Sequence, residues 1–277
     1  MKIIDAHLHF ATDAYFDEIA KAAGHENSEE HLLEQYRMRG MVHGIVMGNL
    51  PVEETKPVYP PFLSYCVGLD SQVFDMDTLP QKLHYIEEHL KRKNCVGIKL
   101  YPGYASFYLY DDKLAPVYEL AARYHKPVAV HTGLTATDHA LLKYSHPLVM
   151  DEAATKFREV QFVMCHFGEP WFTDAAAVIE KNPNVAADLS GMLERKISDF
   201  EAFLRKKHFY IERLKGWLEY LDSYDRFMFG TDWPLANLGD YIDFTKEIIP
   251  QEHWDDVFYK NAMRIYHLPS EAVNPLA

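Results

Sequence analysis

The feature that most constrains this chain is a regular alternation of short apolar runs with longer stretches of helical periodicity. Each run is only a few residues long, is often β-branched, and is followed by Gly, Pro, Asp or Asn. Such runs are typical of parallel strands buried on both faces. Eight of them occur, at residues 2–8, 42–47, 62–69, 95–100, 127–131, 160–166, 185–189 and 226–229.

Helical spacing of apolar residues fills several of the intervals between these runs. Parallel strands need crossover helices on their outer face, so the alternation predicts an α/β fold: a closed (β/α)8 TIM barrel, formed as one domain over residues 1–277. A doubly wound open sheet is the main alternative. It would be favoured by a glycine-rich phosphate loop after the first run, and His7-Leu8-His9-Phe10 is not one. The clearest helical patterns cover residues 29–39, 79–91, 114–124 and 197–221.

Composition excludes several kinds of partner. The formal net charge is −13, which disfavours binding to nucleic acid or to an anionic membrane surface. No apolar run is long enough to span a bilayer, and the N-terminus shows no signal-peptide pattern. The three cysteines are scattered and odd in number, which favours a reducing cytoplasm over a disulfide framework. We therefore expect a cytoplasmic protein that acts on a small molecule, with homo-oligomer formation left open.

The sharpest local motif is His7-Leu8-His9 in the first run. Residues i and i+2 of a strand point to the same side, so both imidazoles can project together from the strand end. Neutral imidazole is a preferred ligand of zinc and similar ions. A His-x-His pair alone is weak evidence for a metal site, since most such pairs are exposed or hydrogen-bonded histidines.

Three further residues close other predicted strands. His131 ends the fifth run, His166 ends the sixth, and Asp232 follows the eighth. A barrel brings the carboxyl ends of its strands to one rim, where barrel enzymes place their sites. Each of these residues alone is as readily a lone polar residue at a strand end. Together with His7 and His9 they predict a catalytic metal site with an open coordination position.

These motifs resemble the amidohydrolase superfamily, especially the amidohydrolase-related (amidohydrolase 2) branch that includes aminocarboxymuconate-semialdehyde decarboxylase-like and resorcylate decarboxylase-like proteins. The resemblance rests on residues 5–9, on His131 and His166, on Gly230-Thr231-Asp232-Trp233-Pro234 and on a closing helix near residues 260–268. It implies a distorted barrel of the metal-dependent hydrolase type that holds one divalent ion. The implied ligands are His7, His9, His131 and Asp232, and His166 is implied to polarise or protonate the substrate.

Zinc is the favoured ion for three imidazoles and one carboxylate, while Mn²⁺, Fe²⁺ and Co²⁺ fit the same ligands. Lys99, near the end of the fourth run, leaves a second ion open. In binuclear relatives a carboxylated lysine on that strand bridges two ions, and His131 and His166 would then serve the second. Alternatively, Lys99 is a free ammonium that binds a substrate carboxylate or a backbone carbonyl. The arrangement with one ion is favoured.

The reaction stays open between two alternatives. In a hydrolase acting on a small carboxylic, lactone or amide substrate, a metal-activated water attacks, Asp232 accepts and later delivers its proton, and His166 stabilises the oxyanion. In a non-oxidative decarboxylase of an aromatic or unsaturated acid, His166 helps to protonate the carbon that loses carbon dioxide, and Asp232 is mainly a ligand. Hydrolysis is favoured. A binding protein that kept the rim of the barrel is a third alternative.

Specificity is expected from the loops after the strands. Aromatic and polar residues there are candidates for contact with the substrate, although such residues often only pack loops: Phe10, Tyr101, Tyr104, Phe107, Tyr108, His139, Trp171, Trp233 and the more ambiguous Arg195. Glu152, Glu169 and Asp188 are unranked candidates for orienting the histidines. Cys165 precedes His166, so strand alternation predicts that its side chain points away from the site, into packing.

Overall fold

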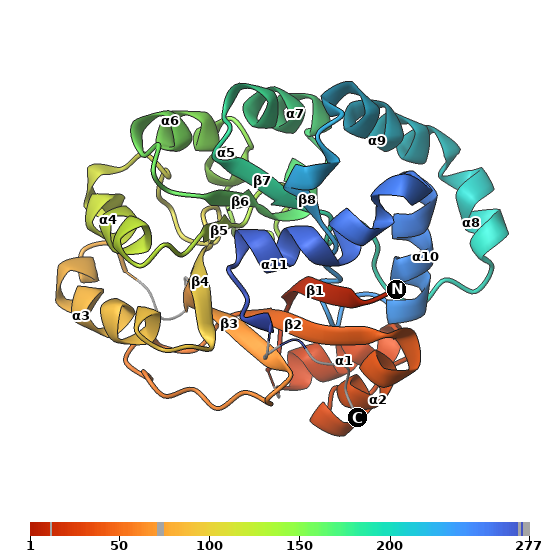
Figure 1. The fold of residues 1–277 in the computed structure, drawn as a ribbon, viewed down its shortest axis with the longest axis horizontal. Coiled ribbons are helices and arrows are strands. Elements are labelled where there is room, and N and C mark those ends of the chain that lie inside the picture. Colours follow the sequence, from red (N-terminus) through yellow and green to blue (C-terminus); the bar gives the residue numbers. More distant parts are fainter. Residues whose placement is uncertain (12, 71–74, 271–272, 274–277) are drawn as a thin grey trace.

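The computed structural model describes residues 1–11, 13–70, 75–270 and 273, and in these the predicted barrel is confirmed. Eight parallel strands follow one another around the sheet in sequence order (Figure 1). Every strand is buried along its whole length, as the unbroken apolar runs require. The strands are β1 (Ile3–Leu8), β2 (Met41–Met47), β3 (Leu63–Leu69), β4 (Cys95–Leu100), β5 (Val128–Val130), β6 (Phe162–Met164), β7 (Val185–Asp188) and β8 (Phe227–Met228).

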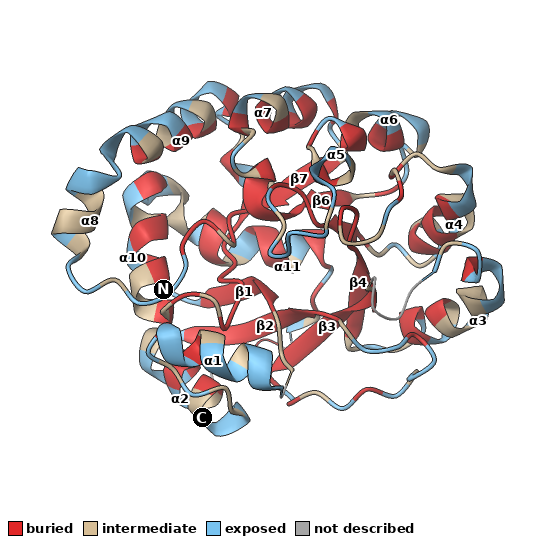
Figure 2. Ribbon diagram, turned by 180° about the vertical axis from the view of Figure 1, so that it is seen from behind, coloured by how far each residue is buried: buried red, intermediate tan, exposed pale blue. Residues whose placement is uncertain are grey.

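Helices form an outer layer around the strands, with their outward faces exposed and their inward faces buried (Figure 2). Three of the four predicted helices match closely. The larger ones are α1 (Ala14–Ala22), α2 (Glu29–Arg39), α3 (Leu79–Leu90), α4 (Ala115–Arg123), α6 (Val149–Lys156), α7 (Phe172–Lys181), α8 (Phe200–Lys206), α9 (His208–Leu221) and α10 (Leu238–Ile248). Two short ones are α5 (Leu142–Ser145) and α11 (Asn261–Ile265).

The single helix predicted over 197–221 is wrong. The chain leaves helical geometry at Lys207, where φ is −99° and ψ is 12°, and this residue separates α8 from α9. Helix α9 buries its apolar stripe, whereas α8 buries no residue fully. Apolar periodicity runs on through Lys207, so the sequence pattern alone could not show where the chain changes direction.

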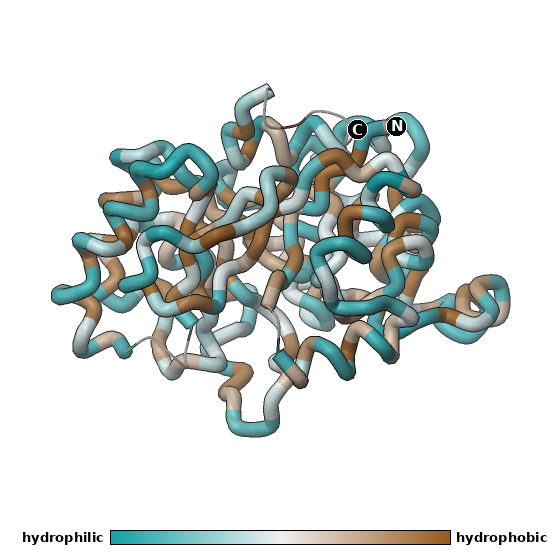
Figure 3. The backbone as a smooth tube through the Cα atoms, turned by 90° about the horizontal axis from the view of Figure 1, so that it is seen from below, coloured by the Kyte–Doolittle hydropathy of each residue, from teal (hydrophilic) through white to brown (hydrophobic). Residues whose placement is uncertain are grey.

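Two hydrophobic layers hold the barrel together. The larger lies between the strands and the surrounding helices, and the smaller fills the barrel interior. At one end the interior layer includes Ala262 and Ile265 of α11, packed with Ile4, Val42 and Val96 from the first halves of their strands. Helix α11 therefore closes the amino-terminal end of the barrel, and apolar chain concentrates toward the centre of the molecule (Figure 3). The opposite end is left for the loops that carry polar residues.

The seam between β8 and β1 is irregular. No continuous ladder joins these strands among the described residues. Instead, the chain after β8 bonds to β1: the amides of Thr231 and Asp232 both donate to the carbonyl of His7, and the amide of His9 donates to the carbonyl of Trp233. Buried Asp5 adds to this seam by accepting bonds from the amide and the hydroxyl of Thr231. The barrel is thus closed by the same segments that carry three of the predicted ligands.

Candidate metal centre

His7 and His9 leave the end of β1 on the same side, as their spacing predicts. Their ring centroids lie 5.7 Å apart. Between Asp5 and Leu8 the register of β1 against β2 shifts irregularly. Such a bulge re-aims side chains and is common beside functional sites. Here it accompanies the turn of the His7 side chain into the barrel, where the residue is fully buried.

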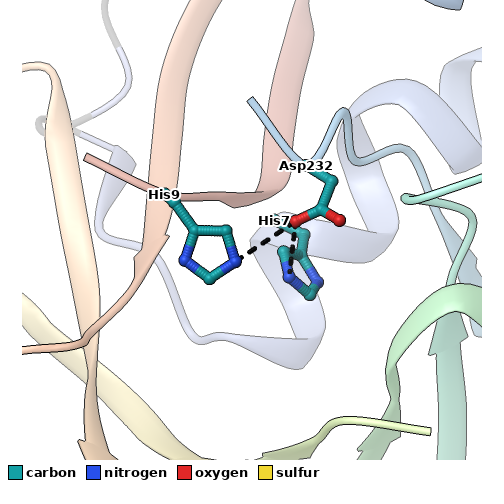
Figure 4. A group of neighbouring side chains, drawn as sticks. All are labelled: His7, His9 and Asp232. Atoms are coloured by element: carbon teal, nitrogen blue, oxygen red, sulfur yellow. Dashed lines mark ion pairs between the residues drawn. The ribbon is translucent and has the colours of Figure 1, made fainter. Parts of the chain in front are cut away.

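Asp232 joins these histidines from the other end of the chain. Its Oδ1 lies 3.4 Å from Nε2 of His7 and 3.3 Å from Nε2 of His9 (Figure 4). The backbone at Asp232 is in the left-handed region, with φ of 55°. For a residue other than glycine this conformation costs about 1–3 kcal/mol, and such strain collects at functional sites. The strained turn directs the carboxylate toward both imidazoles.

The outer nitrogens of both rings already have partners. Nδ1 of His7 lies 2.9 Å from Oδ2 of Asp188, and Nδ1 of His9 lies 2.9 Å from Oδ1 of Asn49. Both partner oxygens accept, so each neutral ring carries its proton on Nδ1. The Nε2 atoms that face Asp232 are therefore bare lone pairs.

Three acceptors thus face one another without a proton between them. Nε2 of His7 and Oδ1 of Asp232 are buried without a hydrogen-bond partner, which is costly unless a cation compensates. Around a tetrahedral zinc ion with bonds of about 2.0 Å, neighbouring ligand atoms stand about 3.3 Å apart. The spacing and the chemistry of these donor atoms fit a divalent ion, so His7, His9 and Asp232 could hold one.

His131 and His166 form a second pair beside this group. Nδ1 of His131 lies 3.2 Å from Nε2 of His166, and Nε2 of His131 lies 3.0 Å from the carbonyl oxygen of Leu134. The ring of His166 is 4.8 Å from that of His7, which places it between the two groups. In the described part of the chain, the donor atoms close enough to share one ion include His7, His9 and Asp232 but not His131. A ligand role for His131 stays a prediction.

His166 is held by contacts from the end of β7. The Ser190 hydroxyl donates to Oδ1 of Asp188 and accepts from Nδ1 of His166 at 2.9 Å. The neutral ring therefore presents a lone pair at Nε2. Gly191 permits this close approach, since its φ is +70° and a Cβ there would lie 2.5 Å from Nδ1 of His166. His166 is itself in the left-handed region, with φ of 62°.

Burial and neighbouring charges set the ionisation of the site. Burial lowers the pKa of His7 to about 4, with a smaller contribution from the Lys99 ammonium. Burial likewise holds the pKa of His131 well below its usual value and lowers that of His166. Burial opposes ionisation of Asp232, but attraction to the surrounding histidines in their protonated forms outweighs burial and lowers the pKa of that carboxyl. At neutral pH the imidazoles of His7, His131 and His166 are therefore neutral and the carboxylate of Asp232 is charged, as ligation requires.

Lys99 is buried in the barrel interior, as its place on β4 suggests. Its Nζ lies 2.9 Å from Sγ of Cys165 and 5.2 Å from the centroid of the Tyr101 ring. The prediction that Cys165 points away from the site is wrong. Cys165 follows the alternation of β6: Phe162 and Met164 lie in the outer layer, and Val163 and Cys165 lie in the barrel interior. The chain then turns at His166, where φ is 62°, so that His166 also reaches the site. Cys165 lies near enough to His7 and Asp188 to share an ion with them. The Nδ1 proton of His7 and the ammonium of Lys99 already lie among these groups, however, which disfavours an ion there.

Some of the predicted substrate contacts lie beside the histidines. Tyr104 packs its ring 4.9 Å from that of His131. Tyr101 is buried, and its hydroxyl donates to the carbonyl of Gly48 at 3.0 Å, with the carbonyl of Met47 3.2 Å away. Phe10 is half-buried and meets the ring of Tyr59 at 6.3 Å. Among these, Tyr104 contacts a histidine of the site, and its hydroxyl accepts a hydrogen bond from the amide of Ala136.

The other predicted contacts lie elsewhere. Trp233 is buried, with its ring 4.7 Å from that of His25. Trp171 packs against His146 at 4.8 Å, and the side chain of His139 is 94% exposed. Of the remaining candidates, Phe107 is buried, Tyr108 stacks on Tyr110, and Arg195 is exposed.

Of the three carboxylates proposed to orient the histidines, Asp188 is the one that does so. Asn49 and Ser190 also hold histidine rings, but neither was predicted from the sequence. Asn49 follows β2, which ends at residue 47, and Ser190 follows β7, which ends at residue 188. Their position at the carboxyl ends of strands was the available signal. As single polar residues in otherwise ordinary loops they carry no motif of their own.

The histidine packed on Trp233 gives a pH-dependent prediction. Nε2 of His25 accepts a hydrogen bond from the amide of Leu238, at the start of α10, and Nδ1 lies 2.9 Å from Nε2 of His31. Burial, followed by the charges of His31, Arg39 and Lys196, lowers the pKa of His25 from 6.5 to about 4. The unfolded chain binds this proton first. Stability is therefore complete above pH 6.5 and is lost as the pH falls toward 4.

Because His25 is only partly buried, we expect this loss to be about 1–2 kcal/mol rather than the full value of the shift. Urea unfolding at pH 7.5 and pH 4.5 measures it. The matched variant is His25→Gln, whose side-chain oxygen can accept from Leu238 but does not titrate. An equal loss of stability in both proteins would show that His25 does not contribute.

A parallel barrel with a His-x-His pair on its first strand and an aspartate after its last strand defines an amidohydrolase-like barrel. A family model described as Amidohydrolase, of the amidohydrolase 2 type, matches residues 4–268, and the chain belongs to this family. The resemblance drawn from the motifs is thereby confirmed. No curated protein matches the chain.

Solved structures share the fold at low identity. An uncharacterized TIM-barrel protein from Bordetella bronchiseptica is 18% identical, with a TM-score of 0.71, and the match covers 97% of this chain and 99% of that one. 5-Carboxyvanillate decarboxylase from Sphingomonas paucimobilis is 13% identical, with a TM-score of 0.63, over 97% and 99%. A probable 2-pyrone-4,6-dicarboxylic acid hydrolase from Acinetobacter baumannii is 15% identical, with a TM-score of 0.63, over 96% and 100%. The fold therefore occurs in a decarboxylase and in a probable hydrolase.

Among the described residues, no helix combines the length and the apolar character needed to cross a bilayer.

Proposed function

We propose that this protein is a metal-dependent hydrolase of a small carboxylic, lactone or amide substrate. One observation carries the proposal: Nε2 of His7 and Nε2 of His9 converge on Oδ1 of Asp232, while the partners of both Nδ1 atoms leave the two Nε2 atoms without a proton. His131 is proposed as the fourth ligand, through the Nδ1 that its bond to Leu134 leaves without a proton. Zinc is the favoured ion, and a second ion is less favoured because Lys99 contacts Cys165 instead of bridging the two histidine groups.

A divalent ion bound there would supply Lewis acidity, which activates a water molecule or polarises a substrate oxygen at neutral pH. The chain's own residues supply the proton transfers. Asp232 is ionised and accepts the proton of the attacking water. His166 presents a lone pair at Nε2, so it must first take a proton from solvent; it can then donate that proton to the departing group, while Asp232 returns its own proton to solvent. To stabilise an oxyanion, His166 must act in its protonated form.

The same residues serve a decarboxylase, in which protonated His166 delivers its proton to the carbon that loses carbon dioxide. Two measurements on the zinc-loaded protein separate the reactions. The protein is incubated in ¹⁸O-water with a panel of carboxylated lactones, amides and aromatic hydroxy acids. We expect ¹⁸O in the product without carbon dioxide. Carbon dioxide without ¹⁸O would establish the decarboxylase instead, and bound substrate without turnover would favour a binding protein.

A change at His166 should separate catalysis from ion binding. His166→Asn is expected to retain the bound zinc of the parent protein while turnover falls by about 10²–10⁴-fold, because proton transfer is lost. Metal analysis and steady-state kinetics test this together. A loss of one ion from a protein that holds two would instead support the arrangement in which His131 and His166 bind a second ion.

A further inference from the structure

His9 is the less enclosed of the two histidines of β1. It lies just beyond the end of the strand, and its side chain is 14% exposed, against 1% for His7. Because little of the barrel surrounds it, a metal ligand in this position needs contacts from neighbouring residues to fix the orientation of its ring. The ring stacks on Phe16 at 5.6 Å, and Nδ1 lies 2.9 Å from Oδ1 of Asn49, which follows β2. Asn49 is thus the polar group that fixes the rotation of the ring.

The orientation of the Asn49 amide follows from its other contacts. Its Nδ2 lies 2.5 Å from Oδ2 of Asp70 and 3.3 Å from the hydroxyl of Tyr101. The Tyr101 hydroxyl donates its only proton to the carbonyl of Gly48, so toward Asn49 it can only accept a hydrogen bond. A carboxylate also only accepts, so the NH₂ group must face Asp70 and the oxygen must face His9. The ring of His9 then carries its proton on Nδ1, and Nε2 is left for an ion.

The strand ends approach closely enough to make this contact because two glycines face each other. A Cβ on Gly68 would lie 1.6 Å from the carbonyl oxygen of Gly48, and a Cβ on Gly48 would lie 2.6 Å from that of Cys66. No larger residue fits at either position without moving the backbone. Asn49 and Asp70 each stand one or two residues beyond these glycines, so the close approach of β2 and β3 brings them together.

We propose that Asn49 and Asp70 are positioning residues: Asp70 orients the amide of Asn49, and Asn49 sets the tautomer and the rotation of His9. This inference rests on the proposed metal site. It adds residues that follow β2 and β3 to a site built from the end of β1 and the chain after β8. Groups that orient a metal ligand typically contribute about 10–100-fold to metal affinity.

The first test measures zinc affinity by competition with a chromophoric chelator. We expect about 10–100-fold weaker binding in Asn49→Leu and a smaller loss in Asp70→Asn, in which the Asn49 amide is free to turn over. The control is Asn261→Leu, which removes bonds to the carbonyls of Tyr224 and Phe227 far from His9. It should lower the melting temperature without weakening zinc binding per folded molecule.

The second test does not need the ion. Nitrogen-15 NMR of the metal-free protein at pH 8 reports which ring nitrogen of His9 carries the proton. We expect Nδ1–H in the parent and a mixture of tautomers in Asn49→Leu and Asp70→Asn. Cobalt substitution adds a visible spectrum that changes in both variants if the ring rotates.

The outcomes distinguish the two proposals. If the parent protein binds no zinc but His9 is an Nδ1–H tautomer that both variants disturb, the metal site fails and the positioning role stands. If the parent binds zinc while Asn49→Leu shows the same affinity, tautomer and cobalt spectrum, the positioning role is overturned and the metal site stands.

Discussion

Replacing Asp232 with asparagine should lower turnover by about 10²–10⁴-fold and release most of the bound zinc. The variant keeps the shape of the side chain but loses the charge that balances the ion and the group that takes the proton of water. Metal analysis of the purified protein and steady-state kinetics measure both losses. The matched control is Asp138→Asn, the same change at a side chain that is 89% exposed on a loop after β5; it should match the parent.

Asp232→Asn also has an expected effect on the metal-free protein, with the opposite sign. In the parent, Oδ1 of Asp232 faces two lone pairs at 3.3 and 3.4 Å. An asparagine NH₂ can donate to one of these nitrogens, so we expect the free energy of unfolding without metal to rise by about 1–3 kcal/mol. Urea unfolding in the presence of a chelator measures this. A drop in stability would mean that the two histidine nitrogens and the Asp232 oxygen do not repel one another when the ion is absent.

Replacing Asp188 with alanine should destabilise the protein by about 3–5 kcal/mol, as expected when one partner of a buried charged network is removed. Asp188 is fully buried and accepts from Nδ1 of His7, the amide of His166, and both the amide and the hydroxyl of Ser190. The variant leaves all of these donors without their acceptor. It also frees the ring of His7, so zinc affinity should fall together with stability.

Urea unfolding at pH 7.5 measures the loss of stability in Asp188→Ala. The control, Asp243→Ala, removes an exposed carboxylate of α10 and should change stability by no more than about 0.5 kcal/mol. Asp188→Asn should lie between them, because its oxygen can still accept while its NH₂ group meets donors. An Asp188→Ala protein as stable as the parent would show that these donors find other partners.

The order of strands could be predicted from the sequence because a parallel strand that is buried on both faces consists of an unbroken run of apolar residues. The run at 95–100 corresponds to β4 without any shift of its ends. The site residues at strand ends followed from the same geometry, since a barrel rim gathers positions that are distant along the chain. His7, His9 and Asp232 meet as expected, whereas His131 pairs with His166 at the edge of the group.

What the sequence could not show depends on backbone conformations that interrupt a regular pattern. The run at 160–166 suggested a strand through His166, but β6 ends at Met164 and His166 takes a positive φ. That turn is why His166 reaches the site, although the preceding residue, Cys165, already follows the strand alternation into the barrel interior. Asn49 and Ser190 act through hydrogen bonds to histidine rings, and the partner of such a bond is fixed only when the strands are in register.

The irregular seam between β1 and the chain after β8 has a consequence for the motions of the molecule. Residues near the beginning of the polypeptide and residues more than two hundred positions later meet there, and an ion held by His7, His9 and Asp232 would act as a clasp between them. Hydrogen exchange at the β1 amides should then slow markedly when zinc is added. Local unfolding along this seam, and proteolysis near the N-terminus, would therefore become less frequent as more metal is bound.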